Sequence, residues 1–434
     1  MDKRAEIKER VLKRIDTRRE DIIRFLQNLI RIPSVTGQER EYQEFIVKTL
    51  GAMGFQVDSW EIDEEELKTK YKDYFAGRML APPLKGRPNV VGTLKGSGGG
   101  KSLLFNGHAD VVSPEPVTNW KHDPWGAEIE NGKLYGRGTC DMKGGIAAHI
   151  MAVKILQDEG IKLKGDLIIE SPIEEEGPGT GTLACQARGY KADAGIITEP
   201  TNNELITAFT GGVYLLIYVD GKASHATMAW EGVNAIEKAF AVIGAIKSYG
   251  EWRTSNCKHP LFARYPQTAG SSPITMFDRA DSKQVGTVPA LVLLGTRGTV
   301  MPGEKPEDII QLMEAWIKKA TDNDHWLKEH PPRFNWYKHG PRSVPAEIPA
   351  EHPLVQTVMT GYKYITGQQP VVAGFISPAD WQSLNTVNPV TPSLGFGPGE
   401  IRQAHTADEY VTIDQVIECT KVLALTILDW CEVA

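Results

Sequence analysis

The chain has 434 residues and a formal net charge of −7 at pH 7. This length exceeds what one compact core organises and predicts two domains, while the charge argues against a nucleic acid or an anionic membrane as the main partner. The five cysteines are widely spaced and form no C-x-x-C pair, which favours a reduced, cytoplasmic protein. No stretch approaches the roughly 18 apolar residues that a membrane span needs.

The N-terminal part of the chain predicts a sheet flanked by helices. Its basic start alternates Lys and Arg with Asp and Glu, which indicates a solvated amphipathic helix and not a targeting peptide. Apolar periodicity then predicts helices at 20–32, 39–54, 144–160 and 181–189, and strands at 55–62, 89–96, 101–110, 166–173 and 194–198. Residues 64–88 are charged and contain prolines, so they are expected to form an irregular surface insertion.

The pattern changes after residue 205 and changes back near residue 340. Between these points it predicts strands at 212–226, 290–300 and 333–340 and helices at 230–250 and 305–322, which suit a small α+β domain of four strands and two helices. Helices follow at 351–367 and 412–430. We therefore expect an α/β catalytic domain with a mixed sheet (1–205 and 340–434) and a second domain (206–339) inserted into it.

Polar residues gather where the strands of the first domain end. They are His108 and Asp110, then Asp141 before a helix, then Glu174, Glu175 and Glu176, then Glu199, and His405 in a late loop. Each has an ordinary explanation when taken alone. Asp141 suits a helix N-cap, consecutive glutamates suit a solvated loop, Glu199 before a proline suits a turn, and a lone histidine suits the surface.

Taken together, these residues favour a metal site. Ligands gather at the carboxyl ends of strands in α/β sheets, and imidazole with carboxylate suits a pair of zinc, cobalt or manganese ions. Such a pair lowers the pKa of a water molecule and polarises the carbonyl that the water attacks. A carboxylate that is not a ligand must then accept the proton of that water.

The ordered motifs "GHADVVSP", "GRGTCDMKGG", "EEEGPGTG", "TEP", "GKASHA" and "GPGE…AHTADE" resemble the co-catalytic zinc amidohydrolases. This family includes acetylornithine deacetylase, succinyl-diaminopimelate desuccinylase, aminoacylase and glutamate carboxypeptidase. The similarity covers essentially the whole chain. It implies a zinc-exopeptidase-like catalytic domain with an inserted lid and dimerisation domain, two divalent metal ions with zinc expected, and a homodimer that acts on a small-molecule substrate.

The resemblance also implies roles for the clustered residues. Asp141 would bridge the two ions, with His108 and Glu199 on one ion and Glu176 and His405 on the other.

The remaining roles that the resemblance implies lie around these ligands. Glu175 would be the general base, and the carboxylate of Asp110 would orient His108. His225 of the inserted domain would reach the active site of the opposite subunit and stabilise the oxyanion. Cys140 is expected to be a packed thiol.

Substrate contacts are expected from three further residues, Arg342, Gly397 and Gly399. Arg342 would pair with a substrate carboxylate, because a guanidinium binds this group through two parallel hydrogen bonds. Arg297 and Arg333 are alternatives for that role, and an exposed surface arginine is the ordinary explanation for any of the three.

Two stretches depart from the family pattern. The segment "QVGTVPA" lacks an asparagine that many relatives carry before the Val-Pro of the lid, and "GTRGTVMPGE" lacks the arginine that carboxypeptidase-type members show before the Pro-Gly. These differences bear on substrate choice more than on reaction type.

The expected activity is removal of an acyl group from the nitrogen of a small amino-acid-like substrate. A carboxypeptidase, a dipeptidase or a hydrolase of carbamoyl or formyl amides is the alternative within the family, since the same attack by water serves all of them. A non-catalytic scaffold on the same fold is the alternative of another class.

Overall fold

A computed structural model describes residues 3–72, 81–281, 284–338 and 340–434 of the chain. The chain divides into two compact units. Unit 1 comprises Met1–Ala208, Glu347–Ala373 and Ala379–Ala434, and unit 2 comprises Phe209–Ala346 and Gly374–Pro378. The short return of residues 374–378 to unit 2 was not part of the sequence prediction.

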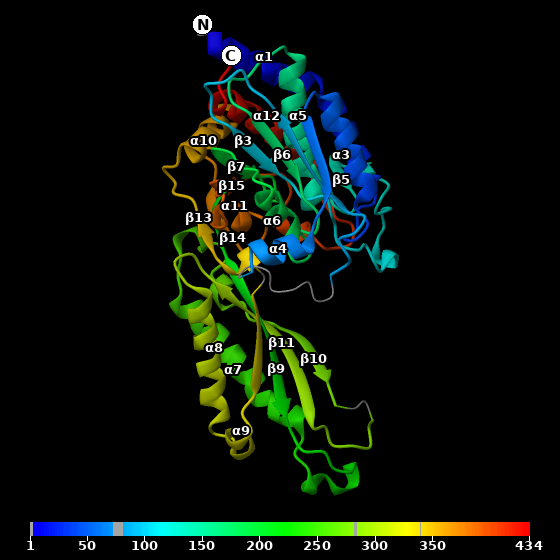
Figure 1. Ribbon diagram of the computed structural model, residues 1–434, viewed down its shortest axis with the longest axis vertical. Helices are drawn as coiled ribbons and strands as arrows, with labels where there is room; N and C mark the ends of the chain where they lie inside the picture. The colour runs from blue at the N-terminus through cyan, green and yellow to red at the C-terminus, as the bar shows by residue number, and fades with distance from the viewer. Residues whose placement is uncertain (1–2, 73–80, 282–283, 339) are drawn as a thin grey trace. The chain divides into compact units, whose positions relative to one another are not determined.

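Unit 1 is organised around a mixed sheet (Figure 1). Within the described residues, this sheet has nine strands in the order β1-β2-β6-β3-β7-β15-β8-β13, with β14 beside β8. The strands are β1 (Gln56–Glu61), β2 (Pro88–Leu94), β3 (Leu103–Asn106), β6 (Leu167–Ser171), β7 (Ala194–Ile197), β8 (Leu205–Phe209), β13 (Ala346–Glu347), β14 (Val372–Phe375) and β15 (Ser393–Gly395). The central strands β6, β3, β7 and β15 run parallel. Every residue of these strands is buried, as expected for strands covered on both faces.

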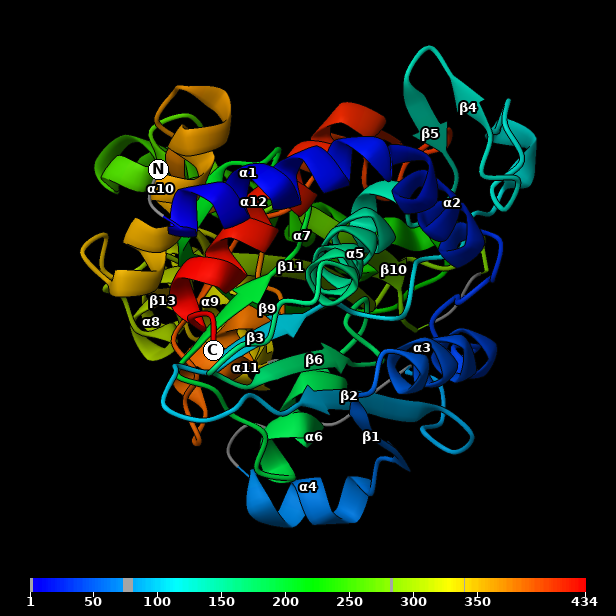
Figure 2. The same cartoon turned by 90° about the horizontal axis from the view of Figure 1, so that it is seen from above.

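Helices cover both faces of this sheet, with α5 and α12 on one side and α6 and α4 on the other (Figure 2). Their bounds are α1 (Lys3–Thr17), α2 (Arg19–Ile30), α3 (Arg40–Ala52), α4 (Glu64–Lys70), α5 (Gly144–Asp158), α6 (Thr180–Ala187), α10 (Pro353–Thr366), α11 (Trp381–Thr386) and α12 (Ile413–Trp430). Helix α5 lies very close to the end of β7, since a Cβ at Gly145 would lie 1.9 Å from the carbonyl oxygen of Thr198. The predicted class, α/β with a mixed sheet flanked by helices, is confirmed.

A three-stranded sheet adjoins these elements in unit 1 and consists of β4 (Ile129–Glu130), β5 (Lys133–Tyr135) and β16 (Tyr410–Thr412), in the order β16-β5-β4. It pairs a segment near Asp141 with a segment near His405. Residues 133–135 and 410–412 are distant in sequence but form neighbouring strands of this sheet.

The segment at 64–88 is less irregular than its composition suggests. It begins with α4, whose N-cap Asp63 accepts hydrogen bonds from the backbone N–H groups of Glu65 and Glu66. The prediction missed this helix because a capping aspartate followed by a charged run carries little apolar periodicity. Residues 73–80 of the predicted insertion lie outside the described residues.

Unit 2 has a four-stranded sheet among its described residues, in the order β10-β11-β9-β12. Its elements are β9 (Gly211–Asp220), α7 (Ala235–Asn256), β10 (Ile274–Arg279), β11 (Leu291–Val300), α8 (Pro306–Thr321), α9 (His325–Glu329) and β12 (Arg333–Lys338). Leu215, Ile217 and Val219 of β9 pack with Val242 and Ile246 of α7 in its core. The prediction did not locate β10, a largely exposed edge strand without apolar alternation.

Helix α7 begins five residues after the predicted start. Asn234 caps it by accepting a hydrogen bond from the N–H of Ile236, and the preceding residues form a short 3₁₀ turn, η3 (Ala226–Glu231). None of the described helices of either unit is both long and apolar enough to cross a membrane.

Candidate metal centre

The parallel strands of unit 1 bring the predicted ligands to one edge of the sheet. His108 follows β3, Glu175 and Glu176 follow β6, and Glu199 follows β7. Asp141 lies in η2 (Thr139–Lys143), directly before α5, and has non-helical φ and ψ angles of −118° and 93°. Because adjacent parallel strands end at the same edge, residues far apart in sequence converge here.

The two oxygens of the Asp141 carboxylate face two different histidines. Oδ1 lies 3.0 Å from Nε2 of His108, and Oδ2 lies 3.5 Å from Nε2 of His405. This arrangement is the one that a carboxylate bridging two cations requires.

The other carboxylates lie around the same two imidazoles. Nε2 of His108 lies 3.7 Å from Oε1 of Glu199 and 4.0 Å from Oε2 of Glu175, and Nε2 of His405 lies 2.9 Å from Oε2 of Glu176. Two sets offer ligand atoms within 4.8 Å of one another, His108 with Glu175 and Glu199, and His108 with Asp141 and Glu176. The structure thus brings together all five predicted ligands and the predicted base.

Burial and the close approach of several charged groups shift the pKa values of residues in this cluster. Burial raises the pKa of Glu199 well above its usual value, and the nearby charge of Asp141 raises it further. For His108, burial alone would lower the pKa, but the hydrogen bond with Asp141 and the charges of Glu199 and Glu175 outweigh it and raise the pKa. Several anions held this closely in a buried site require positive charge beside them.

Two further observations indicate that these side chains are suited to bind divalent cations. Oε1 of Glu176 is buried and has no hydrogen-bond partner within the described residues, so an acceptor atom is open at the centre. Nδ1 of His108 donates to the backbone carbonyl of Asp110 at 2.8 Å, which leaves Nε2 facing the carboxylates, where it would bind a cation once its proton is lost. Imidazole nitrogen and carboxylate oxygen are the ligands that such cations prefer.

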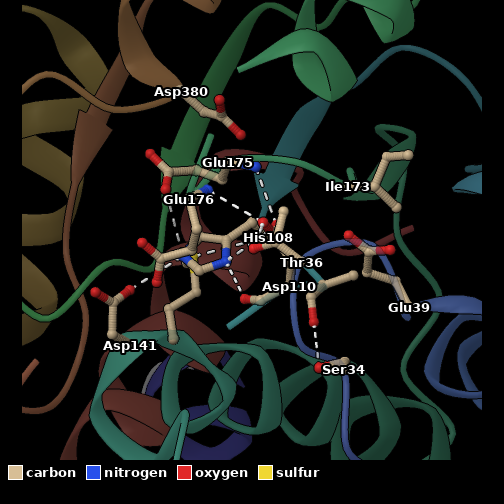
Figure 3. A network of polar contacts seen from close by, with 12 residues as sticks. Ser34, Thr36, Glu39, His108, Asp110, Asp141, Ile173, Glu175, Glu176 and Asp380 are labelled. Carbon is tan, nitrogen blue, oxygen red and sulfur yellow. Dashed lines mark hydrogen bonds and ion pairs between the residues drawn. The ribbon is translucent and has the colours of Figure 1, made fainter. Parts of the chain in front are cut away.

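Asp110 acts differently from its predicted role. Its backbone carbonyl orients His108, while its carboxylate lies 3.8 Å from that ring. The carboxylate accepts the N–H of Glu175 through Oδ1 at 3.0 Å, the N–H of Glu176 through Oδ2 at 3.1 Å, and the hydroxyl of Thr36 at 2.9 Å (Figure 3). Asp110 therefore fixes the backbone that carries both glutamates.

A buried ion-pair network holds the same loop from the other side. The guanidinium of Arg87, 3% exposed, pairs with Glu174 at 2.9 Å and with Glu39 through two hydrogen bonds, the longer of which is 2.7 Å. Both carboxylates are fully buried. Glu174, whose φ is +67°, is thus an anchor of the loop and not a solvated residue.

Sequence reasoning missed two charged residues at this site. Arg87 lies far from Glu174 in sequence, so no local pattern identifies the pair. Glu409 is fully buried and accepts hydrogen bonds from the segment that carries Asp141. The sequence feature that could have identified Glu409 is its position four residues after His405, at the end of the motif "AHTADE".

The other predicted residues lie elsewhere. His225 and Arg342 belong to unit 2, where His225 is exposed and caps η3, and Arg342 lies in a 3₁₀ turn, η6 (Gly340–Ser343). Gly397 and Gly399 are buried, and a Cβ at either would lie within 3.0 Å of Glu199 or Cys140 atoms. Their small size allows this close packing, so a substrate contact by these two glycines stays a prediction. Cys140 is fully buried, as predicted for a packed thiol.

Known proteins resemble the chain over most of its length. It is 28% identical over 442 residues to the N-formyl-4-amino-5-aminomethyl-2-methylpyrimidine deformylase of Bacillus subtilis, covering 96% of both chains. It is 28% identical over 365 residues to the acetylornithine deacetylase of Buchnera aphidicola, covering 83% of this chain and 89% of the other.

Solved structures share the fold at lower identity. A dipeptidase of Saccharomyces cerevisiae superposes with a TM-score of 0.72 and 16% identity over 97% of this chain and 98% of the other. A dinuclear metal-binding peptidase of Bacillus subtilis gives a TM-score of 0.61 and 12% identity over 96% and 99% of the two chains. A model of peptidase family M20/M25/M40 matches residues 104–429. With this match spanning most of the chain and the ligand set in place, the protein belongs to peptidase family M20/M25/M40 and is a metal-dependent hydrolase.

Proposed function

We propose that the protein hydrolyses the amide bond of a small N-acylated amine and releases the acyl group as a carboxylic acid. The observation that carries this proposal is the position of Glu175, whose carboxylate reaches to 4.0 Å from His108 within a cluster suited to two cations. The similarity to a deformylase and to a deacetylase supports an N-acyl substrate over a peptide.

The proposed metal ligands are the five residues named from the sequence. His108 and Glu199 would hold one ion, Glu176 and His405 the other, and Asp141 would bridge them. We propose zinc, with cobalt and manganese as alternatives, because imidazole and carboxylate accommodate all three. When bound, a pair of divalent ions makes a water molecule more acidic and polarises the substrate carbonyl.

Glu175 and Glu176 are adjacent in sequence but are proposed to have different roles, Glu175 as the general base and Glu176 as a metal ligand. Oε2 of Glu176 points to His405 and Oε2 of Glu175 points to His108, so the two side chains diverge. Glu175 would accept a proton from the attacking water as its oxygen bonds to the carbonyl carbon. The C–N bond then breaks, and Glu175 delivers the proton to the leaving nitrogen.

Within this proposal there are two candidates for the acyl group, a formyl group and a larger group such as acetyl or succinyl. Two deformylases, from Bacillus subtilis and Halalkalibacterium halodurans, are each 28% identical to the chain and match 96% and 98% of it. The acetylornithine deacetylase matches a smaller share, 83%. A formyl group is the smallest acyl group. The two candidates therefore differ in how much room the active site must have for the acyl group of the substrate.

A matched substrate panel tests the proposal. The purified protein, reconstituted with zinc, is assayed against N-formyl, N-acetyl and N-succinyl derivatives of the same amines and amino acids, and against dipeptides. We expect kcat/KM to be highest for one acyl series and to vanish after chelation. Preference for dipeptides over every N-acyl compound would support the peptidase alternative, and no turnover with intact metal content would support the scaffold alternative.

Unit 2 is proposed to act as a lid and to form the interface of a homodimer. Its edge strand β10 presents Met276 and Phe277, which are 36% and 46% exposed, and α7 presents Phe240 at 63% exposure. An edge strand with exposed apolar side chains favours association with a second copy. His225, exposed on the same unit, would then complete the active site of the partner subunit.

A subunit-mixing experiment tests this arrangement. Glu175→Gln and His225→Ala chains, each inactive alone, are mixed under conditions that allow exchange. A hybrid dimer has one site with both groups intact, so we expect part of the activity to return. No recovery after exchange has been verified by mass spectrometry would contradict a role for His225 in the opposite subunit.

Arg342 is proposed to pair with a substrate carboxylate. Arg342→Met removes the guanidinium while keeping much of the apolar stem, so we expect a higher KM for carboxylate substrates and an unchanged KM for the matching amides. Arg333→Met is the control, because Arg333 is 59% exposed and already pairs with Asp220 at 3.0 Å. Equal effects on acids and amides would exclude Arg342 from this role.

The cytoplasmic location stays a prediction from the cysteine pattern. All five cysteines are free thiols in the structure, and four of them are buried.

A further inference from the structure

We propose that Glu409 is a positioning residue that holds the two ligand segments of the metal centre in register. One segment carries Asp141 and the other carries His405. This inference rests on the proposed function, in which both residues bind metal. The carboxylate of Glu409 accepts hydrogen bonds from the backbone of the Asp141 segment and from Arg137, so it acts on the ligands through the backbone.

The carboxylate of Glu409 is saturated by four donors. Oε1 accepts the N–H groups of Cys140 at 2.9 Å and Asp141 at 3.0 Å. Oε2 accepts the N–H of Gly138 at 3.0 Å and the Arg137 guanidinium at 2.7 Å. The side chain is fully buried, so no solvent replaces these bonds.

The segment that Glu409 binds has little regular structure of its own. Asp141 has φ −118° and ψ 93° inside η2, and Gly138 has a left-handed φ of +85°. Donors at Gly138, Cys140 and Asp141 therefore depend on an acceptor from outside the segment. Without Glu409, these buried N–H groups lose their partner, and the backbone of the bridging aspartate loses its fixed position.

Glu409 also anchors the segment of His405. Its backbone carbonyl accepts the N–H of Gly136 at 2.9 Å, and the adjacent Asp408 accepts the N–H groups of Lys121 and His122 through Oδ1. His405 and Asp408 have left-handed φ angles of +61° and +53°. The same residue thus ties the loop of His405 to the loop of Asp141, whose facing atoms lie 3.5 Å apart.

The chemistry of this contact requires a carboxylate of this length. In Glu409→Gln, an amide NH₂ group replaces one of the two carboxylate oxygens. The two donors that this oxygen accepts then lose their acceptor and face another donor. In Glu409→Asp the charge remains, but the chain is one methylene shorter and does not reach all four donors. Hydrogen-bond partners of metal ligands contribute roughly 10- to 100-fold to metal affinity when they are removed.

The test measures metal affinity and not only activity. Metal-free wild-type protein and Glu409→Gln are titrated with Zn²⁺ against a chromogenic chelator, and the Co²⁺ forms are compared by absorption spectroscopy. We expect at least one of the two ions to bind roughly 10- to 100-fold more weakly to the variant, with an altered Co²⁺ spectrum. Glu400→Gln, a half-exposed carboxylate of the same loop paired with Arg402, is the matched control and should bind both ions as the wild type does.

Each outcome separates positioning from a purely structural role. Wild-type affinity and spectrum in Glu409→Gln, even with lower thermal stability, would overturn the inference. If Glu409→Gln does not fold, Glu409→Asp decides, and unchanged affinity in that variant overturns the inference equally. Failure of the wild-type protein to bind two divalent ions would instead contradict the proposed function.

Discussion

The two histidines of the metal centre are at opposite extremes of burial. The His108 side chain is 1% exposed, follows a buried strand and has both ring nitrogens within 3.0 Å of a partner. The His405 side chain is 55% exposed and lies in a loop with a left-handed φ. We call the strand ends that carry His108, Asp110, Glu175 and Glu199, with the buried ion pairs of Arg87 beside them, the buried half of the site. Residues 400–408, which include His405, are the exposed half.

This contrast shows that the ligands of one site are held in position in two different ways. Strand ends and saturated hydrogen bonds fix the buried half, so its geometry depends on the core of unit 1. Loop contacts fix the exposed half, and these contacts concentrate on Glu409. Loss of a side chain should therefore affect folding strongly in the buried half and little in the exposed half. Glu409 itself is buried and pairs with the buried Arg137, so its loss should also lower stability.

The largest expected effect comes from Glu175 in the buried half and separates catalysis from metal binding. Glu175→Gln removes the proposed base, so kcat should fall about 10²- to 10⁴-fold, while both metal ions remain by elemental analysis. Asp141→Ala should instead lose metal, since that carboxylate faces both histidines. Retention of more than a tenth of the activity by Glu175→Gln would rule out Glu175 as the base.

Arg87 offers a test of folding in the buried half. Arg87→Met leaves Glu39 and Glu174 buried without their counter-charge, so the free energy of unfolding should fall by about 3–5 kcal/mol in urea titrations. Arg402→Met is the control from the exposed half. Its guanidinium is 70% exposed and pairs with Glu400 at 3.4 Å, so its loss should cost less than ~1 kcal/mol. Equal losses in the two variants would remove the distinction between the halves.

The two histidines permit a direct comparison in metal-free protein. His108→Ala breaks buried hydrogen bonds with Asp110 and Asp141, so the free energy of unfolding should fall by ~1–3 kcal/mol. For His405→Ala we expect a smaller loss, because its side chain is 55% exposed and solvent weakens its ion pairs. Both variants should bind less metal than the wild type. The prediction is wrong if His405→Ala is the less stable variant.

The smallest expected effect concerns pH. Burial, with a smaller contribution from the charge of Asp380, raises the pKa of Glu170 on β6 to about 8, although the hydrogen bond from the Asn106 amide lowers it. An acid whose pKa is higher in the folded state stabilises the fold at low pH and loses this contribution as pH rises from about 4.5 to about 8. Glu170→Gln keeps an acceptor for the Asn106 amide but has no proton to lose.

Unfolding titrations at pH 7 and pH 8 measure this effect. Over this interval the wild type should lose stability relative to Glu170→Gln by at most ~1.4 kcal/mol. Glu400→Gln, from the exposed half, is the control and should follow the wild type. Parallel pH profiles for the wild type and Glu170→Gln would show that Glu170 does not titrate in this range.

Much of this fold follows from local patterns. The buried runs of β3, β6 and β7 are short and apolar, and α5, α8 and α12 show long stretches of helical residues, so their existence and type could be predicted. The ligands at the ends of those strands could be predicted as a group, because parallel strands bring their carboxyl ends to one edge.

The missed features depend on partners that are distant in sequence. The pairing of Arg87 with Glu39 and Glu174, and of Glu409 with the Asp141 segment, arises only when the chain is folded. The family resemblance assigned the carboxylate of Asp110 to His108, while its hydrogen bonds come from the N–H groups of Glu175 and Glu176 and from the Thr36 hydroxyl. The helix α4 and the strand β10 lack the apolar periodicity that local prediction requires.

The order of segments along the chain also determines when the site can form during synthesis. His108, Asp141, Glu176 and Glu199 leave the ribosome before unit 2, whereas His405 and strand β15, which pairs with both β7 and β8, follow it. At ~5–20 residues per second, on the order of 10 to 40 s separate the translation of Glu199 from that of His405. Until then, a nascent chain lacks one histidine and the strand between β7 and β8. The complete ligand set, and with it metal capture at both positions, is therefore a late event in the life of each chain.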